Sequence, residues 1–71
     1  MGKYKQNHHY LVKQKVTYNT PIIKIFVLYE SDSCYHIERE NDYITWELKS
    51  NWDDDYAIID DLGENYKFQG Q

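Results

Sequence analysis

The stretch that most restricts the fold is residues 22–29, I-I-K-I-F-V-L-Y, which is apolar on both faces of an extended strand. Alternate residues of a strand share a face, so Ile25, Val27 and Tyr29 are expected on one side and Phe26 on the other. A strand covered on both sides belongs at the centre of a sheet, and in a small barrel one long bent strand serves both faces. We therefore expect residues 22–29 to be the central strand.

The other apolar residues are also of strand-forming kinds. The 71-residue chain has eight Tyr, two Trp and two Phe, and aromatic and β-branched side chains suit a pleated, half-buried surface better than a helix. Alternation and turn residues predict further strands at 10–16, 34–39, 43–49 and 56–59, with a last one at 66–68. The expected fold is all-β and admits one short helix. The strands are expected to form a small barrel of five to six antiparallel strands.

Two local expectations follow from this pattern. In residues 43–49 the alternation is clearest, so Ile44, Trp46 and Leu48 are expected to point inward. Gly63 supplies the positive φ that a hairpin loop needs, so that 66–68 would return antiparallel to the strand before it.

Residues 50–55 are predicted as a loop, with a short helix capped by Ser50 or Asn51 as the weaker alternative. Trp52 in this segment is either a lid over one end of the barrel or an exposed aromatic anchor.

The domain organisation is simple. Residues 1–7 are polar and without periodicity and are expected to form a disordered N-terminal tail, and residues 8–71 a single domain. A chain of this length buries only about 60% of its unfolded surface, which leaves little for a deep pocket. We therefore expect neither an enzyme nor a small-molecule substrate.

Catalytic and metal-ligating patterns are weak. Cys34 and His36 share a strand face, but a zinc site needs four ligands, and the adjacent His8 and His9 would point to opposite faces. The consecutive acids of residues 53–55 do not match a calcium loop. No catalytic residue, no metal site and no cofactor are predicted.

Charge is divided along the chain. Residues 1–29 hold five Lys and no acid, whereas residues 30–71 hold twelve acids and three basic residues. The net charge of −4 is therefore +5 followed by −9, and in one small domain the two blocks lie close together. This bipolar arrangement favours a protein surface as partner over a bare polyanion.

Two sets of candidate contact residues result. The first would bind another protein through acidic and aromatic loops: Tyr10, Tyr18, Trp52, Asp53, Asp54, Asp55 and Tyr56. The alternative is single-stranded nucleic acid bound by the basic first third, through Lys3, Lys5, Lys13, Lys15 and Lys24. We expect the protein partner.

The composition of the chain gives an expectation for its cellular compartment and its origin. One cysteine forms no internal disulfide, which suits a reducing compartment, and no apolar run is long enough for a membrane span. We expect a cytoplasmic protein with no membrane partner. Residues with AT-rich codons, such as Ile, Lys, Asn and Tyr, are abundant, which suggests a low-GC bacterium or its phage.

The pattern of a basic first strand, a long apolar second strand, a hairpin at Asn41-Asp42 and a closing Y-A-I-I-D-D-L-G-E-N-Y-K-F segment is similar to that of SH3-like barrels. Over its whole length the chain resembles the YorP family of small prophage and phage proteins. The resemblance implies an SH3-like fold with a short helix and an accessory role in a phage or its bacterial host, with a host or phage protein as partner. By analogy with SH3 domains, the candidate groove aromatics are Tyr10, Tyr18, Trp46, Trp52 and Tyr56.

Overall fold

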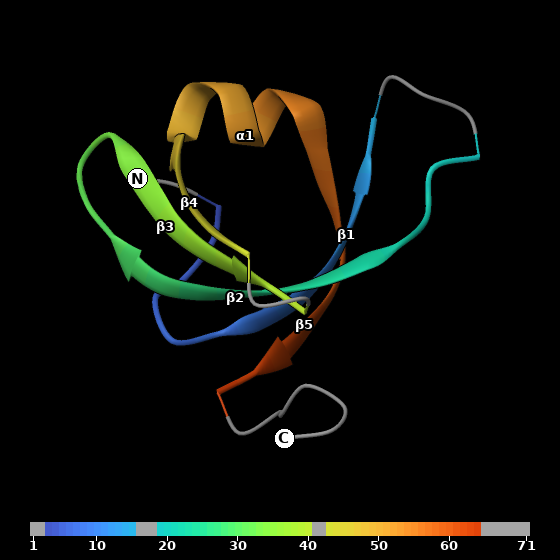
Figure 1. The fold of residues 1–71 in the computed structure, drawn as a ribbon, viewed down its shortest axis with the longest axis horizontal. Helices are drawn as coiled ribbons and strands as arrows, with labels where there is room; N and C mark the ends of the chain where they lie inside the picture. The colour runs from blue at the N-terminus through green and yellow to red at the C-terminus, as the bar shows by residue number, and fades with distance from the viewer. Residues whose placement is uncertain (1–2, 16–18, 41–42, 65–71) are drawn as a thin grey trace.

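The computed structural model describes residues 3–15, 19–40 and 43–64 of the chain (Figure 1). The elements in chain order are β1 (His9–Gln14), β2 (Ile23–Glu30), β3 (Cys34–Arg39), β4 (Ile44–Leu48), α1 (Lys49–Asp55) and β5 (Tyr56–Gly63). The predicted class, all-β with one short helix, is confirmed. The return strand expected at 66–68 lies outside the described residues.

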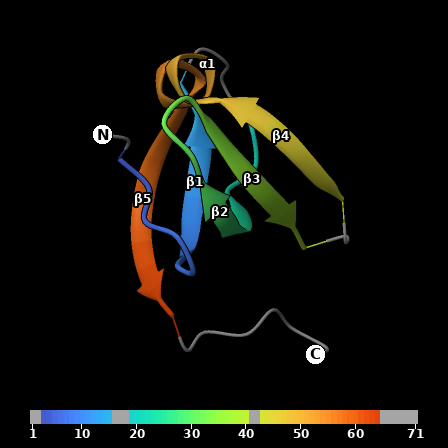
Figure 2. The same ribbon diagram turned by 90° about the vertical axis from the view of Figure 1, so that its left-hand side faces the viewer.

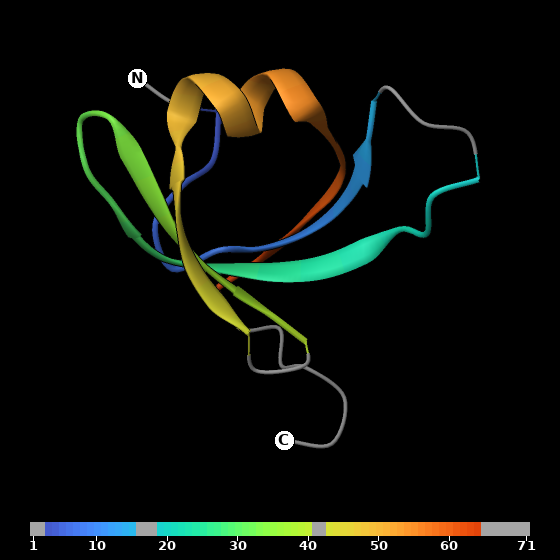
Figure 3. The same cartoon turned by 45° about the horizontal axis from the view of Figure 1, so that its top comes forward.

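The five strands form one antiparallel sheet in the order β4-β3-β2-β1-β5. β2 occupies the centre, as its two apolar faces predict. The sheet curls around its interior, and α1 lies across one end of the curl (Figures 1 and 3). Among the described residues no ladder joins β4 to β5, so the sheet is open and these two strands form its margins (Figure 2).

β5 is longer than the sequence predicts and is irregular. It pairs with β1 through two register shifts, at which Ile59 and Leu62 are each the extra residue on β5. Such bulges bend a strand and increase its twist. Gly63 ends the strand with a φ of 83°, so the positive φ expected at this glycine is confirmed.

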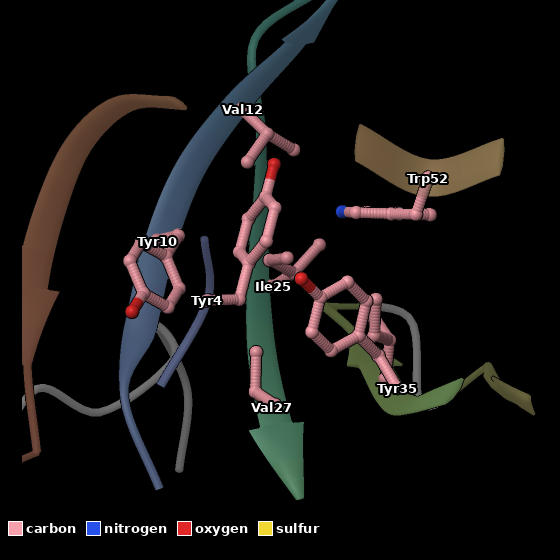
Figure 4. Packing of buried hydrophobic residues seen from close by; sticks show 8 residues of the cluster. Tyr4, Tyr10, Val12, Ile25, Val27, Tyr35 and Trp52 are labelled. Atoms are coloured by element: carbon pink, nitrogen blue, oxygen red, sulfur yellow. The ribbon is translucent and has the colours of Figure 1, made fainter. Parts of the chain in front are cut away.

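The interior is largely aromatic. Figure 4 shows the rings of Tyr4, Tyr10, Tyr35 and Trp52 gathered over the aliphatic side chains of β1 and β2. Edge-to-face contacts place the Tyr4 ring centroid 4.9 Å from that of Tyr10 and 5.2 Å from that of Tyr35, a favourable geometry for aromatic pairs. Among the residues that the structure describes, the buried apolar ones are Tyr4, Tyr10, Val12, Ile25, Val27, Tyr35, Ile37 and Trp52.

Burial of Tyr4 corrects the expectation of a disordered tail for residues 3–7. The Tyr4 side chain is only 1% exposed, and the Asn7 N–H donates to the Val27 carbonyl at 2.7 Å. The burial of Tyr4 could not be predicted from the sequence, because a single aromatic residue among polar ones forms no periodic pattern. The segment before β1 is therefore part of the core.

The helix α1 also corrects the sequence prediction, which favoured a loop at 50–55. Leu48 occupies the N-cap position, without a side-chain cap bond, so neither Ser50 nor Asn51 caps the helix. Trp52 is the buried residue of α1. Short helices gain most of their stability from packing, and here the packing of Trp52 onto the core supplies it.

Candidate protein-binding surface

β4 faces the opposite way from the sequence prediction. Ile44, Trp46 and Leu48 are exposed, with the indole of Trp46 58% accessible. The register explains this orientation, because Tyr35 and Ile37 of β3 are fully buried and pair with Glu47 and Thr45. Residues directly opposite in a sheet share a face. The predicted burial of the three apolar residues of β4 is therefore wrong.

The polar side of β4 is held by an arginine. The Arg39 guanidinium donates to Thr45 Oγ1 at 2.9 Å and lies 3.5 Å from Glu47 Oε2. The Thr45 hydroxyl donates to the same Glu47 oxygen at 2.6 Å. Hydrogen bonds to charged groups of this kind compensate for partial burial. The network satisfies the polar residues of β4 on the inner side and leaves the apolar ones outside.

The outer side of β2, β3 and β4 consequently carries a contiguous aromatic and aliphatic surface, here called the outer face. Trp46 lies flat on His36, with ring centroids 4.2 Å apart and planes 5° apart. Tyr29 meets Trp46 edge to face at 6.2 Å. Ile44 and Leu48 flank the indole along β4 and are both about half exposed. A grouped apolar surface of this kind is typical of binding sites.

Tyr29 reaches the outer face through a bulge. The ladder between β2 and β3 shifts register between Val27 and Tyr29, so that Tyr29 leaves the side on which Ile25 and Val27 are buried. Strict alternation placed all three on one face, which is wrong for Tyr29. The bulge thus explains why Tyr29 is 49% exposed. No residue type in β2 predicts this bulge.

The outer face contains one carboxylate within its cross-strand rows. Glu38 lies on β3 opposite Phe26 of β2 and Ile44 of β4. The row beside it consists of Tyr29, His36 and Trp46. Glu38 is therefore the one carboxylate among the described strand residues of this face. Lys24 of β2 lies on the same side, beyond Phe26, with its Nζ 4.0 Å from Glu40.

The aromatic residues predicted to bind a partner lie mostly in the core. Tyr10 and Trp52 are each only 2% exposed, and Tyr56 is half-buried and stacks on Trp52 with ring centroids 4.0 Å apart. Tyr18 lies outside the described residues. Trp52 is thus the lid of the two alternatives, and because Trp46 is on the other side of the sheet, the two indoles do not line one groove.

The acidic candidates have different roles. The Tyr35 hydroxyl donates to Asp53 Oδ1 at 3.0 Å, which ties α1 to β3. Lys15 Nζ donates to the Asp53 backbone carbonyl at 2.8 Å. Asp54 and Asp55 are exposed on α1. Of the three acidic candidates, only Asp54 and Asp55 therefore form the exposed acidic surface that the sequence predicted.

Burial changes the acidity of the core tyrosines. Desolvation raises the pKa of Tyr4 to about 12. The Trp52 N–H points toward the Tyr4 hydroxyl without reaching hydrogen-bond distance (Figure 4) and offsets part of this rise. Burial, together with the negative Asp53, also raises the pKa of Tyr35. Burial does the same for Tyr10. These phenols therefore remain protonated and uncharged at neutral pH.

The lysines proposed for nucleic-acid binding are interleaved with acids. Lys24 Nζ lies 4.0 Å from Glu40, and Lys15 is bonded to α1 as described above. Next to β1, His8 Nδ1 lies 3.0 Å from Asp61, and this bond lowers the pKa of the Asp61 carboxyl. Lys3 and Lys5 are exposed ahead of β1, and Lys13 is half-buried on it. The arrangement does not present the uninterrupted basic stripe that a phosphate backbone favours.

Cys34 and His36 do share a face, as predicted, and Cys34 is a free thiol. Within residues 3–15, 19–40 and 43–64, no group of three or more His, Cys, Asp or Glu side chains is placed to hold a metal ion. The same described part of the chain contains no helix with the length and apolar character needed to cross a membrane.

A comparison of the chain with protein-family models, with curated proteins and with solved structures finds no match in any of the three.

Proposed function

We propose that this chain is a non-enzymatic protein-binding module and that its contact surface is the outer face of β2, β3 and β4. The observation that carries the proposal is the continuous set of exposed rings and aliphatic side chains centred on Trp46 and Tyr29. Aromatic residues of this kind supply much of the affinity at protein interfaces. The acidic and aromatic loops proposed from sequence are replaced here by this face, because their rings are buried.

The chemistry of the face defines the partner. An apolar surface with one embedded carboxylate, Glu38, fits a protein segment that carries aliphatic or aromatic side chains and one Lys or Arg opposite that carboxylate. A chain with a net charge of −4 also attracts a basic partner over distances of about one Debye length, roughly 10 Å at 0.1 M salt. The partner is therefore proposed to be a protein with a mixed apolar and basic surface.

The proposed setting is the cytoplasm of a bacterial cell, where the chain serves as a phage or prophage accessory protein. Two sequence features support this setting: the codon-related composition bias and the resemblance of the whole chain to small phage proteins. The partner is then a host or phage protein. No cofactor takes part in the proposed activity.

The test combines capture with titration. The full chain is immobilised and exposed to host lysate, and each retained protein is purified and titrated by calorimetry against the wild type and three variants. Trp46→Ala is expected to weaken binding at least tenfold, which is about 1.4 kcal/mol. Glu38→Gln is expected to weaken it less, with an effect that fades as salt increases. Ile59→Ala, a matched exposed aliphatic residue on β5, should leave the affinity unchanged.

Three outcomes contradict the proposal. The lysate contains no protein that binds the chain, or binding survives Trp46→Ala but is lost when Asp54 and Asp55 are both changed to Asn, which would place the contact on α1. The third is tight, salt-sensitive binding of a single-stranded oligonucleotide at about 50 mM salt that is lost on replacing the lysines, which would favour nucleic acid as the partner.

A further inference from the structure

The two margins of the sheet differ in how well they are protected. The β5 margin is irregular, with two bulges, and carries Asp60 and Asp61 on exposed positions. Bulges and charges are the usual devices that prevent a margin from pairing with another strand. β4 has no bulge, because its ladder with β3 contains no register shift, and its exposed side chains are Ile44, Trp46 and Leu48. Its one charged residue, Glu47, lies on the inner side and is bonded to Arg39 and Thr45.

The backbone N–H and C=O groups of the exposed β4 residues also point away from β3, in the plane of the sheet. The Arg39 N–H donates to the Tyr43 carbonyl and the Lys49 N–H to the Ser33 carbonyl. In an antiparallel ladder, hydrogen-bonded pairs occur at every second residue, so Thr45 and Glu47 also bond toward β3.

The N–H and C=O groups of Ile44 and Trp46 consequently point away from β3, as does the N–H of Leu48, while the Leu48 carbonyl serves the first turn of α1 from the N-cap position. β4 is the last strand of the sheet, and among the described residues no strand pairs with it on that side. The margin thus combines two features. Its backbone hydrogen-bonding groups point away from β3 in the plane of the sheet, and its apolar side chains lie on the outer face.

We propose that β4 pairs antiparallel with β4 of a second copy of this chain, so that one sheet continues through both copies. The proposal goes beyond the protein-binding function, because it concerns the strand margin and not the outer face. It is independent of whether that face has another partner.

The register of the pair follows from charge. With Trp46 opposite its own counterpart, Ile44 lies opposite Leu48 of the second copy and Thr45 opposite Glu47. About four backbone hydrogen bonds form, and each Glu47 lies opposite a neutral Thr45 rather than another charge. Moving the centre to Glu47 would place two carboxylates directly opposite each other, which is destabilising. The pairing centred on Trp46 avoids this.

Pairing at the margin also enlarges the outer face. Tyr29, Ile44, Trp46 and Leu48 are each about half exposed and together offer roughly 400 Å² of side chain, since one large aromatic side chain covers about 150–250 Å². Two paired copies place these surfaces side by side on one sheet and offer roughly 800 Å², which is what each partner contributes to an interface of standard size. A second copy is therefore the occupant that makes the face large enough for specific binding.

Sedimentation velocity of the full chain from micromolar to millimolar concentration tests the proposal. The wild type should shift from the mass of one chain to that of two, and amide exchange at Trp46 should slow as the concentration rises. Leu48→Pro should remain a single chain throughout, because the Leu48 φ of −65° suits proline and the substitution removes the outward N–H that would donate to the Ile44 carbonyl of the second copy. Trp46→Lys should do the same by placing a charge on the margin.

Two control variants distinguish this pairing from other contacts. Ile59→Lys lies on the opposite margin and Tyr29→Lys on the outer face, and both should dimerise like the wild type. Circular dichroism confirms that each variant is folded, and if Leu48→Pro does not fold, Trp46→Lys decides. A wild type that stays a single chain overturns the proposal, as does a dimer that survives Trp46→Lys. A dimer lost on Tyr29→Lys would indicate face-to-face packing, which also overturns it.

Discussion

Trp46 rests on the imidazole of His36, with ring planes 5° apart, on the side of the sheet opposite Trp52. Of the two tryptophans, Trp52 closes the core and is 2% exposed, whereas Trp46 is 58% exposed. The two faces of one sheet therefore separate the buried tryptophan from the exposed one.

This separation predicts opposite effects on stability. Trp52→Ala should lower the free energy of unfolding by about 3–5 kcal/mol, because it removes a large side chain from the core. Trp46→Ala should cost no more than about 1 kcal/mol, the value of an aromatic pair beyond its buried area. Urea denaturation at low protein concentration, where chains are single, measures both. Equal losses for the two variants would mean that Trp46 is a core residue after all.

The link between α1 and β3 gives a second prediction. Tyr35→Phe removes the hydroxyl that donates to Asp53 and should cost about 1.5–3 kcal/mol, the range for hydrogen bonds to charged groups. Asp53→Ala removes the acceptor. A double-mutant cycle by urea denaturation should show a coupling of about 1 kcal/mol or more between the two positions. Strict additivity would show that the bond contributes nothing to stability.

The buried tyrosines predict a loss of stability at alkaline pH. The pKa of Tyr4 rises from 10.0 unfolded to about 12 folded, so the folded state keeps its proton where the unfolded chain loses it. Tyr4 is protonated in both states below pH 10, and the free energy of unfolding should fall by about 2–3 kcal/mol as the pH rises from about 10 to about 12. Because the pKa values of Tyr10 and Tyr35 are also raised, the three effects act in the same direction.

The Tyr4→Phe variant isolates this effect. The Tyr4 hydroxyl is buried without a hydrogen-bond partner among the described residues, so removing it should be neutral or stabilising at pH 7. The variant should also unfold at a higher pH than the wild type when fluorescence is followed through an alkaline titration. A variant that is less stable at every pH would show that the hydroxyl is satisfied in solution.

Gly63 gives a fourth prediction, at the end of β5. Its φ of 83° lies in the region that L-residues avoid, whereas a Cβ at this position would meet no atom within 4 Å. Gly63→Ala should therefore cost about 1 kcal/mol through backbone conformation alone. Gly63→Asn should cost less, because asparagine tolerates this region. Thermal unfolding compares the two, and a Gly63→Ala variant as stable as the wild type would contradict the assignment.

Much of the fold could be predicted from the sequence because the residue types are those of strands. The apolar run of residues 22–29 correctly indicated the central strand, and β1 alternates as expected, with Tyr10 and Val12 buried. The class of the domain depends on such averaged preferences, which single-residue exceptions do not disturb.

The contact surface could not be predicted in the same way. The alternation of residues 43–49 is correct as a strand pattern, but alternation alone does not say which of its two faces is buried. That choice depends on pairing with β3, whose Tyr35 and Ile37 are inward, and on the Arg39 network that satisfies the polar side. Pairing between strands is a long-range property, as is the bulge that turns Tyr29 outward.

The aromatic core has a consequence for synthesis of the chain. Its rings come from positions 4, 10, 35 and 52, which span most of the length from the first described residues to the helix. A nascent chain can assemble the central strands early, but Tyr4 has no tryptophan to pack against until α1 has left the ribosome. Folding of this domain is therefore expected to finish only after α1 has left the ribosome, and the apolar strands stay exposed to solvent until then.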